Sequence, residues 1–157
     1  MRLSDREDAT FDKLTVYVDE KWKVKHCDDV PVPGYLILQP VGYYRSISLF
    51  SPELKESLGD MLSNCVDAVE QAVRPERVYT ACFNESNGGI HFHVFPRMRE
   101  MNVFGVRDGQ LVVDGPLLFS QVRNTFRRSD PFPDAGEQIA DAVHAIRTLL
   151  VKSQHMR

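Results

Sequence analysis

The chain has 157 residues, 43% of them hydrophobic and 26% charged, which suits one globular domain with a sizeable core. Its 19 basic and 22 acidic residues are interspersed and give a net charge of −3, so we expect no nucleic-acid partner and no anionic membrane partner. No apolar run approaches the roughly 20 residues that a transmembrane helix needs.

The N-terminus and the cysteines indicate a compartment. The stretch from Met1 to Asp12 is charged throughout, whereas a secretory signal has a basic start followed by an apolar run. The three cysteines, Cys27, Cys65 and Cys82, are an odd number without C-x-x-C spacing, which predicts neither a disulfide framework nor a cysteine-rich zinc site. We therefore expect a cytoplasmic protein with buried, reduced thiols.

The first third of the chain predicts strands. Thr15–Val18 and Trp22–His26 are rich in β-forming residues and are separated by a short polar turn. The prolines of Val30–Gly34 disfavour helix and make a stiff connector. Tyr35–Gln39, which follows and ends at Pro40, is predicted to be a buried central strand.

A long helix is expected next. Ser51 is a typical N-cap, and the proline and glutamate that follow it suit the first helical turn. Apolar residues recur every three or four positions as far as Val73, and Pro75 marks the exit. This apolar stripe predicts that the helix packs on the sheet.

The second half predicts two hairpins. Val78–Asn84 and Ile90–Pro96 resemble antiparallel strands joined by Glu85–Gly89, whose adjacent glycines permit a tight reversal. A second hairpin is expected from Val103–Arg107 and Gln110–Val113, because the Asp-Gly pair between them suits a two-residue turn.

Two helices complete the predicted elements. Leu117–Arg127 has helical composition, and Ala135–Lys152 carries apolar residues at helical spacing. The stripe of the latter helix is expected to pack in the core.

Two histidines form the main chemical signal. Alternate residues of a strand face the same way, so His91 and His93 share one surface while Phe92 and Val94 face the other. The Asn87–Gly89 loop before them can turn backbone N–H groups inward to hold an anion. A phosphate beside two histidines is the ligand that this pattern favours.

These residues also resemble a known family, the histidine triad (HIT) superfamily. The segment His91–Arg97, preceded by Asn84–Gly89, is similar to the last two histidines and the tail of the family signature. The segment Val32–Pro40 resembles the family's Pro-Gly-His strand, and Leu49–Glu53 resembles its Leu-Ser-Pro-Glu helix start. With the early tryptophan strand, the resemblance covers Thr15–Arg97 in order.

The resemblance implies an α+β fold: an antiparallel sheet of about five strands, with the Ser51–Val73 helix on one face and a nucleotide site on the other. A C-terminal hairpin and helices are expected in addition. The whole chain, residues 1–157, is expected to be a single HIT-like domain with a core at about 11–97 and an extension at 98–157. A homodimer is expected from the resemblance alone.

The function implied by the resemblance is hydrolysis or nucleotidyl transfer at the α-phosphate of a nucleoside 5′-phosphate conjugate, such as a dinucleoside polyphosphate or a phosphoramidate. His91 occupies the position of the family nucleophile, which forms a nucleotidyl-histidine intermediate, and neutral imidazole suits that task. His93 would donate a hydrogen bond to a phosphate oxygen. The mechanism requires no cofactor, although Mg²⁺ can accompany a polyphosphate substrate.

The resemblance also implies binding residues. Gly88 and Gly89 would hold the phosphate through their backbone N–H groups, together with the Asn84 side chain. For the ribose hydroxyls the candidates are Asp28 and Asp29, of which we expect Asp28.

Two departures from the family pattern leave the activity open. Gly89 stands in place of the first triad histidine, and Tyr35 stands in place of the histidine of the Pro-Gly-His strand. Tyr35 can take over an orienting role because its hydroxyl both donates and accepts hydrogen bonds. Some two-histidine branches are active, which favours an enzyme. The alternative is a catalytically impaired nucleotide-binding module.

A third hypothesis is a metal site at His91 and His93. Zinc would need a third or fourth ligand. The available residues have no persuasive spacing and are His26, His144, Cys82 and Glu85.

Overall fold

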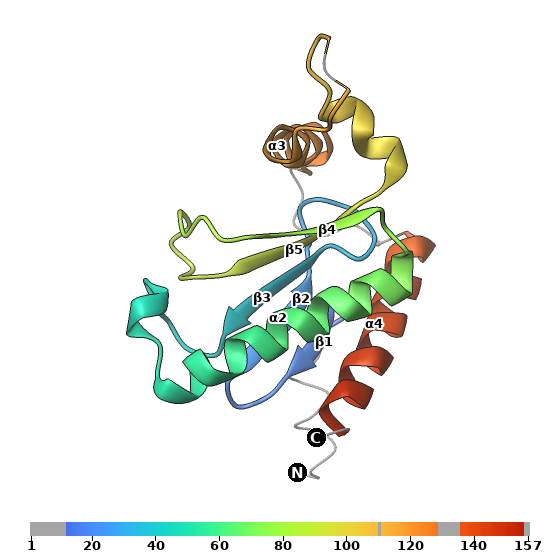
Figure 1. Cartoon of the computed structure of the whole chain (residues 1–157). Helices are drawn as coiled ribbons and strands as arrows, with labels where there is room; N and C mark the ends of the chain where they lie inside the picture. Colours follow the sequence, from blue (N-terminus) through green and yellow to red (C-terminus); the bar gives the residue numbers. More distant parts are fainter. Residues whose placement is uncertain (1–11, 110, 129–135, 156–157) are drawn as a thin grey trace.

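The computed structural model describes residues 12–109, 111–128 and 136–155, and it contains one antiparallel sheet with helices on both faces (Figure 1). The strand order is β1-β2-β3-β5-β4. The charged stretch before Asp12, Gln110 of the expected second hairpin and Ala135 lie outside the described residues. The strands are β1 (Thr15–Val18), β2 (Trp22–His26), β3 (Leu36–Pro40), β4 (Arg77–Ala81) and β5 (Phe92–Arg97). This architecture confirms the predicted α+β class with five strands.

The long helix α2 (Pro52–Val73) begins and ends as its local chemistry dictates. The Ser51 side chain accepts a hydrogen bond from the Leu54 N–H and so caps the first turn. Arg74 closes the last turn in the left-handed conformation at φ 50°. The predicted boundaries of this helix are confirmed.

The alternation of side chains along the central strands separates two cores. Leu36 and Leu38 of β3 and Val94 of β5 face α2, with no exposed side-chain surface. Tyr35 and Phe95 face the opposite side of the sheet and are equally buried. Because the register places Ile37 opposite His93, the chemical residues of β5 lie on the face away from α2.

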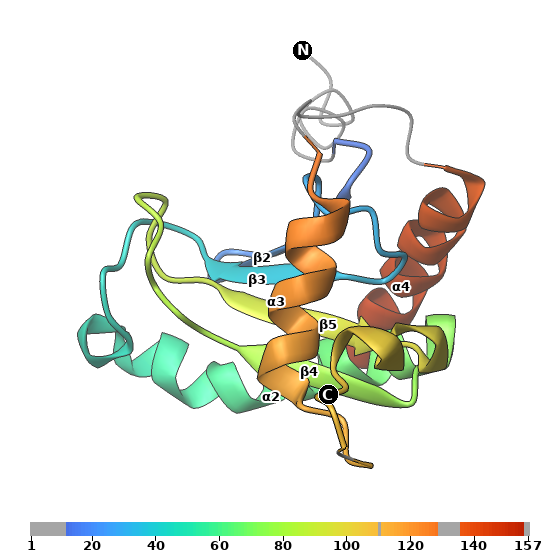
Figure 2. The same ribbon diagram turned by 90° about the horizontal axis from the view of Figure 1, so that it is seen from above.

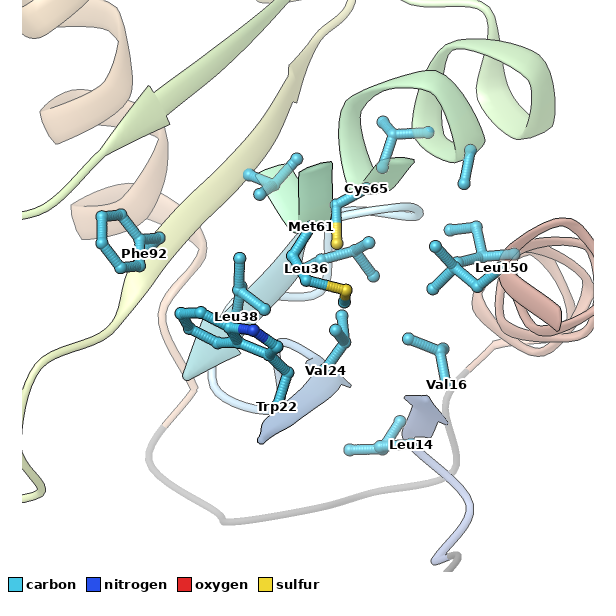
Figure 3. Packing of buried hydrophobic residues seen from close by; sticks show 14 of the residues in the cluster. Leu14, Val16, Trp22, Val24, Leu36, Leu38, Met61, Cys65, Phe92 and Leu150 are labelled. Atoms are coloured by element: carbon cyan, nitrogen blue, oxygen red, sulfur yellow. The ribbon is translucent and has the colours of Figure 1, made fainter. Parts of the chain in front are cut away.

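The larger core fills the space between the sheet and two helices (Figure 3). Trp22 is fully buried, packs edge-to-face on Phe50 and donates its indole N–H to the Ser57 hydroxyl. The C-terminal helix α4 (Glu137–His155) contacts α2 and β1, and Ile146 and Leu150 complete this core. The predicted core role of the last helix is thereby confirmed. None of the described helices combines the length and apolarity required to cross a bilayer.

A third helix, α3 (Gly115–Phe126), crosses the other face of the sheet (Figure 2). Asp114 caps it by accepting the Leu117 N–H. The residues that α3 buries against Tyr35 and Phe95 are Leu118, Phe119 and Val122. This smaller core forms the base of the face that carries the histidines.

The predicted second hairpin is wrong. Arg99–Phe104 forms a 3-10 helix, η2, and no strand is described between Met98 and α3. The apolar side chains that favoured a strand find no sheet face to pack on, since Val103 is 75% exposed and Leu111 is fully exposed. A turn does form at Gly109, but it belongs to a loop.

Candidate functional site

A polar cavity of about 370 Å³ lies along the central strands, on the face covered by α3. His91 precedes β5 and His93 lies within it, with their ring centres 5.1 Å apart. The residues lining the cavity include Asp28, Tyr35, Gly88, His91, His93 and Arg123. The structure therefore brings together five of the seven predicted site residues.

The hydrogen bond of His91 determines which of its nitrogens is available. Nδ1 of His91 lies 3.0 Å from the carbonyl oxygen of Gly89. A carbonyl only accepts, so Nδ1 carries the proton, and in the neutral ring Nε2 keeps its lone pair. In its neutral form, the half-buried imidazole that lines the cavity therefore has an unprotonated Nε2.

His93 is held by Tyr35. The Tyr35 hydroxyl and Nδ1 of His93 are 2.6 Å apart, and both side chains are buried. Among the described residues Nδ1 is the only hydrogen-bond partner of this hydroxyl, so a satisfied phenol donates to it. In the neutral ring the proton of His93 then resides on Nε2.

Burial keeps this pair uncharged. Burial, together with the nearby Arg123 guanidinium and His91, lowers the pKa of His93 to about 4. Burial also raises the pKa of Tyr35 above its ordinary value. At neutral pH the pair is therefore a neutral imidazole beside a neutral phenol.

The loop before His91 requires glycine at position 89. Gly89 has φ +87°, and the neighbouring Ile90 N–H donates to the Tyr44 carbonyl at 2.7 Å. A Cβ atom at Gly89 would lie 3.1 Å from the Tyr43 ring and 3.2 Å from the Tyr44 carbonyl oxygen. Gly88 lines the cavity, whereas Gly89 contributes the carbonyl that orients His91.

The two aspartates at the cavity, Asp28 and Asp29, differ in their hydrogen bonds and ion pairs. Asp29 accepts the Cys27 thiol at 3.1 Å and pairs with Arg127 at 3.4 Å. Burial raises the pKa of Cys27 to about 12, so the thiol stays protonated and donates. Asp28 also lines the cavity and is exposed, which leaves its carboxylate available to a ligand.

Asn84 does not line the cavity. Its backbone is left-handed at φ 55°, and its side-chain amide donates to the Arg45 carbonyl. The side chain is exposed and braces two loops. Of the three predicted phosphate-binding residues, Gly88 alone is among the described residues that line the cavity.

The metal hypothesis gains no ligand set at the histidines. Among the described residues, the group of possible ligands close enough to share an ion is Cys27, Asp28 and Asp29, which includes no histidine. His26 is fully engaged: Nε2 accepts the Gly34 N–H at 3.0 Å and Nδ1 donates to the Cys27 carbonyl at 2.9 Å.

Sequence reasoning missed the contribution of α3. Arg123 lines the cavity, and its guanidinium carbon lies 5.0 Å from the centre of the Phe119 ring. The Phe119 ring in turn packs edge-on against His93, with ring centres 5.4 Å apart. Phe119 and Arg123 are four positions apart on a helix that lies outside the segment resembling the HIT family. This spacing could have indicated that the two side chains share one helix face.

Comparison with known proteins finds similar structures but no similar sequences. No protein-family model and no curated protein sequence matches the chain. Solved structures do match. A histidine triad protein from Marinobacter aquaeolei is 19% identical, with 96% of each chain covered and a TM-score of 0.59. A zinc-bound histidine triad family protein from Mycobacterium smegmatis is 15% identical, with 98% of this chain and 94% of that chain covered and a TM-score of 0.58.

A third match, a hypothetical histidine triad nucleotide-binding protein from Sulfolobus tokodaii, is 12% identical, with 93% of this chain and 89% of that chain covered and a TM-score of 0.59. At such identities the likeness concerns the arrangement of helices and strands over nearly the whole chain. The chain has the histidine triad fold.

Proposed function

We propose that this protein is a nucleotide-binding hydrolase or nucleotidyl transferase of the HIT type. It acts at the α-phosphate of a nucleoside 5′-phosphate conjugate through a nucleotidyl-histidine intermediate. The observation that carries the proposal is the hydrogen bond from Nδ1 of His91 to the Gly89 carbonyl, which leaves Nε2 as a neutral nucleophile at a polar cavity.

In the first step, Nε2 of His91 donates its lone pair to the α-phosphorus and a P–N bond forms. The bond from phosphorus to the leaving group breaks, and the leaving group departs with the electron pair. Nε2–H of His93, held in that tautomer by Tyr35, donates a hydrogen bond to a phosphate oxygen as negative charge builds on it.

In the second step, water or another acceptor attacks the same phosphorus. The P–N bond breaks, its electron pair returns to Nε2 of His91, and the proton of the attacking water passes to solvent. The product is the nucleoside monophosphate, and the imidazole is restored. The exposed carboxylate of Asp28 is the group that we expect to bind the ribose hydroxyls.

The reduced triad is compatible with this chemistry because two other groups orient the rings. The Gly89 carbonyl, rather than a side chain, fixes the tautomer of His91. Tyr35 fixes His93. The nucleotide ligand is supported by the fold and by the nucleotide-binding description of the Sulfolobus tokodaii neighbour.

The test is a metal-free turnover assay against diadenosine polyphosphates, adenosine and guanosine phosphoramidates, and nucleotide sugars. We expect wild type and the His144→Ala control, whose exposed histidine lies on α4, to release nucleoside monophosphate. His91→Ala should lose at least about 10³-fold in rate and form no phosphorus-linked intermediate. Turnover that persists in His91→Ala contradicts the mechanism.

Absence of turnover with intact nucleotide binding in wild type and His91→Ala would replace the enzyme with a binding module. Because one structural neighbour is described as zinc-bound, the assay is repeated with Zn²⁺ and with chelator. Activity that requires added metal would also overturn the metal-free mechanism.

A further inference from the structure

Arg123 enters the cavity from a part of the chain that the histidine motif does not reach. It lies on the third turn of α3, the helix that crosses the histidine-bearing face of the sheet (Figure 2). Its guanidinium is stacked at 5.0 Å over Phe119, and its charge is close enough to lower the pKa of His93. The side chain is therefore positioned against the histidine pair.

Among the described residues, the Arg123 guanidinium has no hydrogen-bond acceptor. Two other arginines have carboxylate partners: Arg127 pairs with Asp29, and Arg107 pairs with Asp114. Arg123 makes no ion pair with any described residue, and its Nε is buried without a hydrogen-bond partner. A buried N–H of a charged group costs free energy unless an acceptor is supplied, so this donor points to a ligand.

The charge balance of the cavity indicates the kind of ligand. His93 is neutral at pH 7, and Gly89 stands where the family has another histidine. Two carboxylates also line the cavity: Asp29, which is paired with Arg127, and the exposed Asp28. Arg123 is the one arginine or lysine among the described residues that line it. An oxyanion in this cavity would therefore depend on Arg123 for its compensating positive charge.

We propose that Arg123 binds the phosphate of the nucleotide and is the main electrostatic determinant of phosphate affinity at this site. This inference rests on the proposed function. A guanidinium presents paired N–H donors that match two phosphate oxygens, and stacking on Phe119 orients the fork before the ligand arrives. The α3 helix thus supplies a cation that the reduced histidine motif lacks, and this cation selects for a phosphate-bearing ligand.

The experiment compares the binding of AMP, adenosine and inorganic pyrophosphate by titration calorimetry at pH 7.5. We expect wild type to bind AMP more tightly than adenosine. Arg123→Gln should weaken AMP and pyrophosphate binding by about 10-fold or more and leave adenosine binding unchanged. Arg123→Lys should recover part of the loss, because it restores the charge without the fork.

The matched control is Arg128→Gln, which removes the same charge from an exposed side chain just beyond α3 and should bind AMP as wild type does. Equal AMP affinity in wild type and Arg123→Gln overturns the role of Arg123 while leaving the proposed function intact. An equal loss of adenosine and AMP affinity also overturns it, since that result marks a packing role. If wild type binds neither AMP nor adenosine, the nucleotide function itself fails.

Discussion

The Tyr35 hydroxyl lies 2.6 Å from Nδ1 of His93, across the pairing of β3 with β5. Tyr35 therefore orients the second histidine of the pair, so the orienting role that the sequence predicts for this tyrosine acts on His93. His91 is oriented by the backbone of its own loop instead. Different hydrogen-bond partners thus determine the tautomers of the two rings, so a substitution can change the tautomer of one ring without changing that of the other.

Tyr35→Phe should lower turnover by about 10²-fold, comparable to the loss of one preorganised donor at a reacting phosphate. Without the phenol, Nδ1 of His93 has no partner in either tautomer, so the Nε2–H form is no longer enforced. The measurements are the turnover rate and the ¹⁵N shifts of the His93 ring, which should show a mixture of tautomers.

Tyr79→Phe is the matched control for this variant. Tyr79 lies on β4, stacks on Phe95 and is not among the residues that line the cavity. Removing its hydroxyl should therefore leave the turnover rate and the tautomer of the His93 ring unchanged. If Tyr35→Phe retains full turnover with a single Nε2–H tautomer, Tyr35 has no positioning role.

Restoring the first triad histidine should increase neither the turnover rate nor the stability of the protein. Gly89→His places a side chain at φ +87° against the Tyr43 ring and the Tyr44 carbonyl, so we expect a loss of about 1–3 kcal/mol in the free energy of unfolding and no gain in turnover.

Two alanine variants separate the causes of that loss. Gly89→Ala and Gly109→Ala both introduce a Cβ at positive φ, but nothing lies within 4 Å of the Cβ position at Gly109. Urea unfolding should show Gly89→Ala to be the more destabilised of the two. Equal destabilisation would mean that the contacts with Tyr43 and Tyr44 do not constrain the loop.

The neutral state of His93 predicts a preference among leaving groups. A phosphate departs as an anion, whereas an amine needs a proton, and an imidazole with a pKa of about 4 is rarely protonated at pH 7.5. We expect AMP release from a diadenosine polyphosphate to exceed release from an adenosine phosphoramidate by about 10-fold or more at pH 7.5.

The ratio of the diadenosine polyphosphate rate to the phosphoramidate rate should fall as the pH is lowered from 7.5 to 5. The protonated fraction of His93 increases as the pH approaches the pKa of this ring. Measuring the ratio of the two rates removes any common effect of pH on the nucleophile. A ratio that is constant across this range would show that His93 does not control departure of the leaving group.

The local features of the fold could be predicted from the sequence because short-range chemistry determines them. The Ser51 cap, the alternation of side chains between the two faces at β5 and the glycine-rich reversal depend on neighbours in the chain. The expected hairpin near Gly109 failed because turn chemistry alone does not make a strand when the flanking apolar residues, such as Leu111, have no face to cover.

Long-range features of the site were not accessible in this way. The contact of Tyr35 with His93 depends on the β3–β5 register, and strand pairing over 58 positions of chain leaves no local pattern. Arg123 reaches the cavity only because α3 packs on Tyr35 and Phe95. The four-residue spacing of Phe119 and Arg123 indicates one helix face, but it does not indicate that this face covers the histidines.

Acid should destabilise the protein through His26. Burial lowers the pKa of this ring below 6.5, so the unfolded state binds more protons than the folded state at mildly acidic pH. Its contribution to stability is complete above about pH 6.5 and is lost as the pH falls below that value. The lowered pKa of His93 acts in the same direction, so the free energy of unfolding should decrease between pH 7.5 and pH 5.

His26→Asn separates this effect from other titrations. At pH 7.5 the variant should lose about 2–4 kcal/mol, because the ring that accepts the Gly34 N–H and donates to the Cys27 carbonyl is fully buried. Its further loss between pH 7.5 and pH 5, measured by urea unfolding, should be smaller than that of wild type. His144→Asn, an exposed control, should follow the wild-type curve. Parallel curves for His26→Asn and wild type would show that His26 is not the group that senses acid.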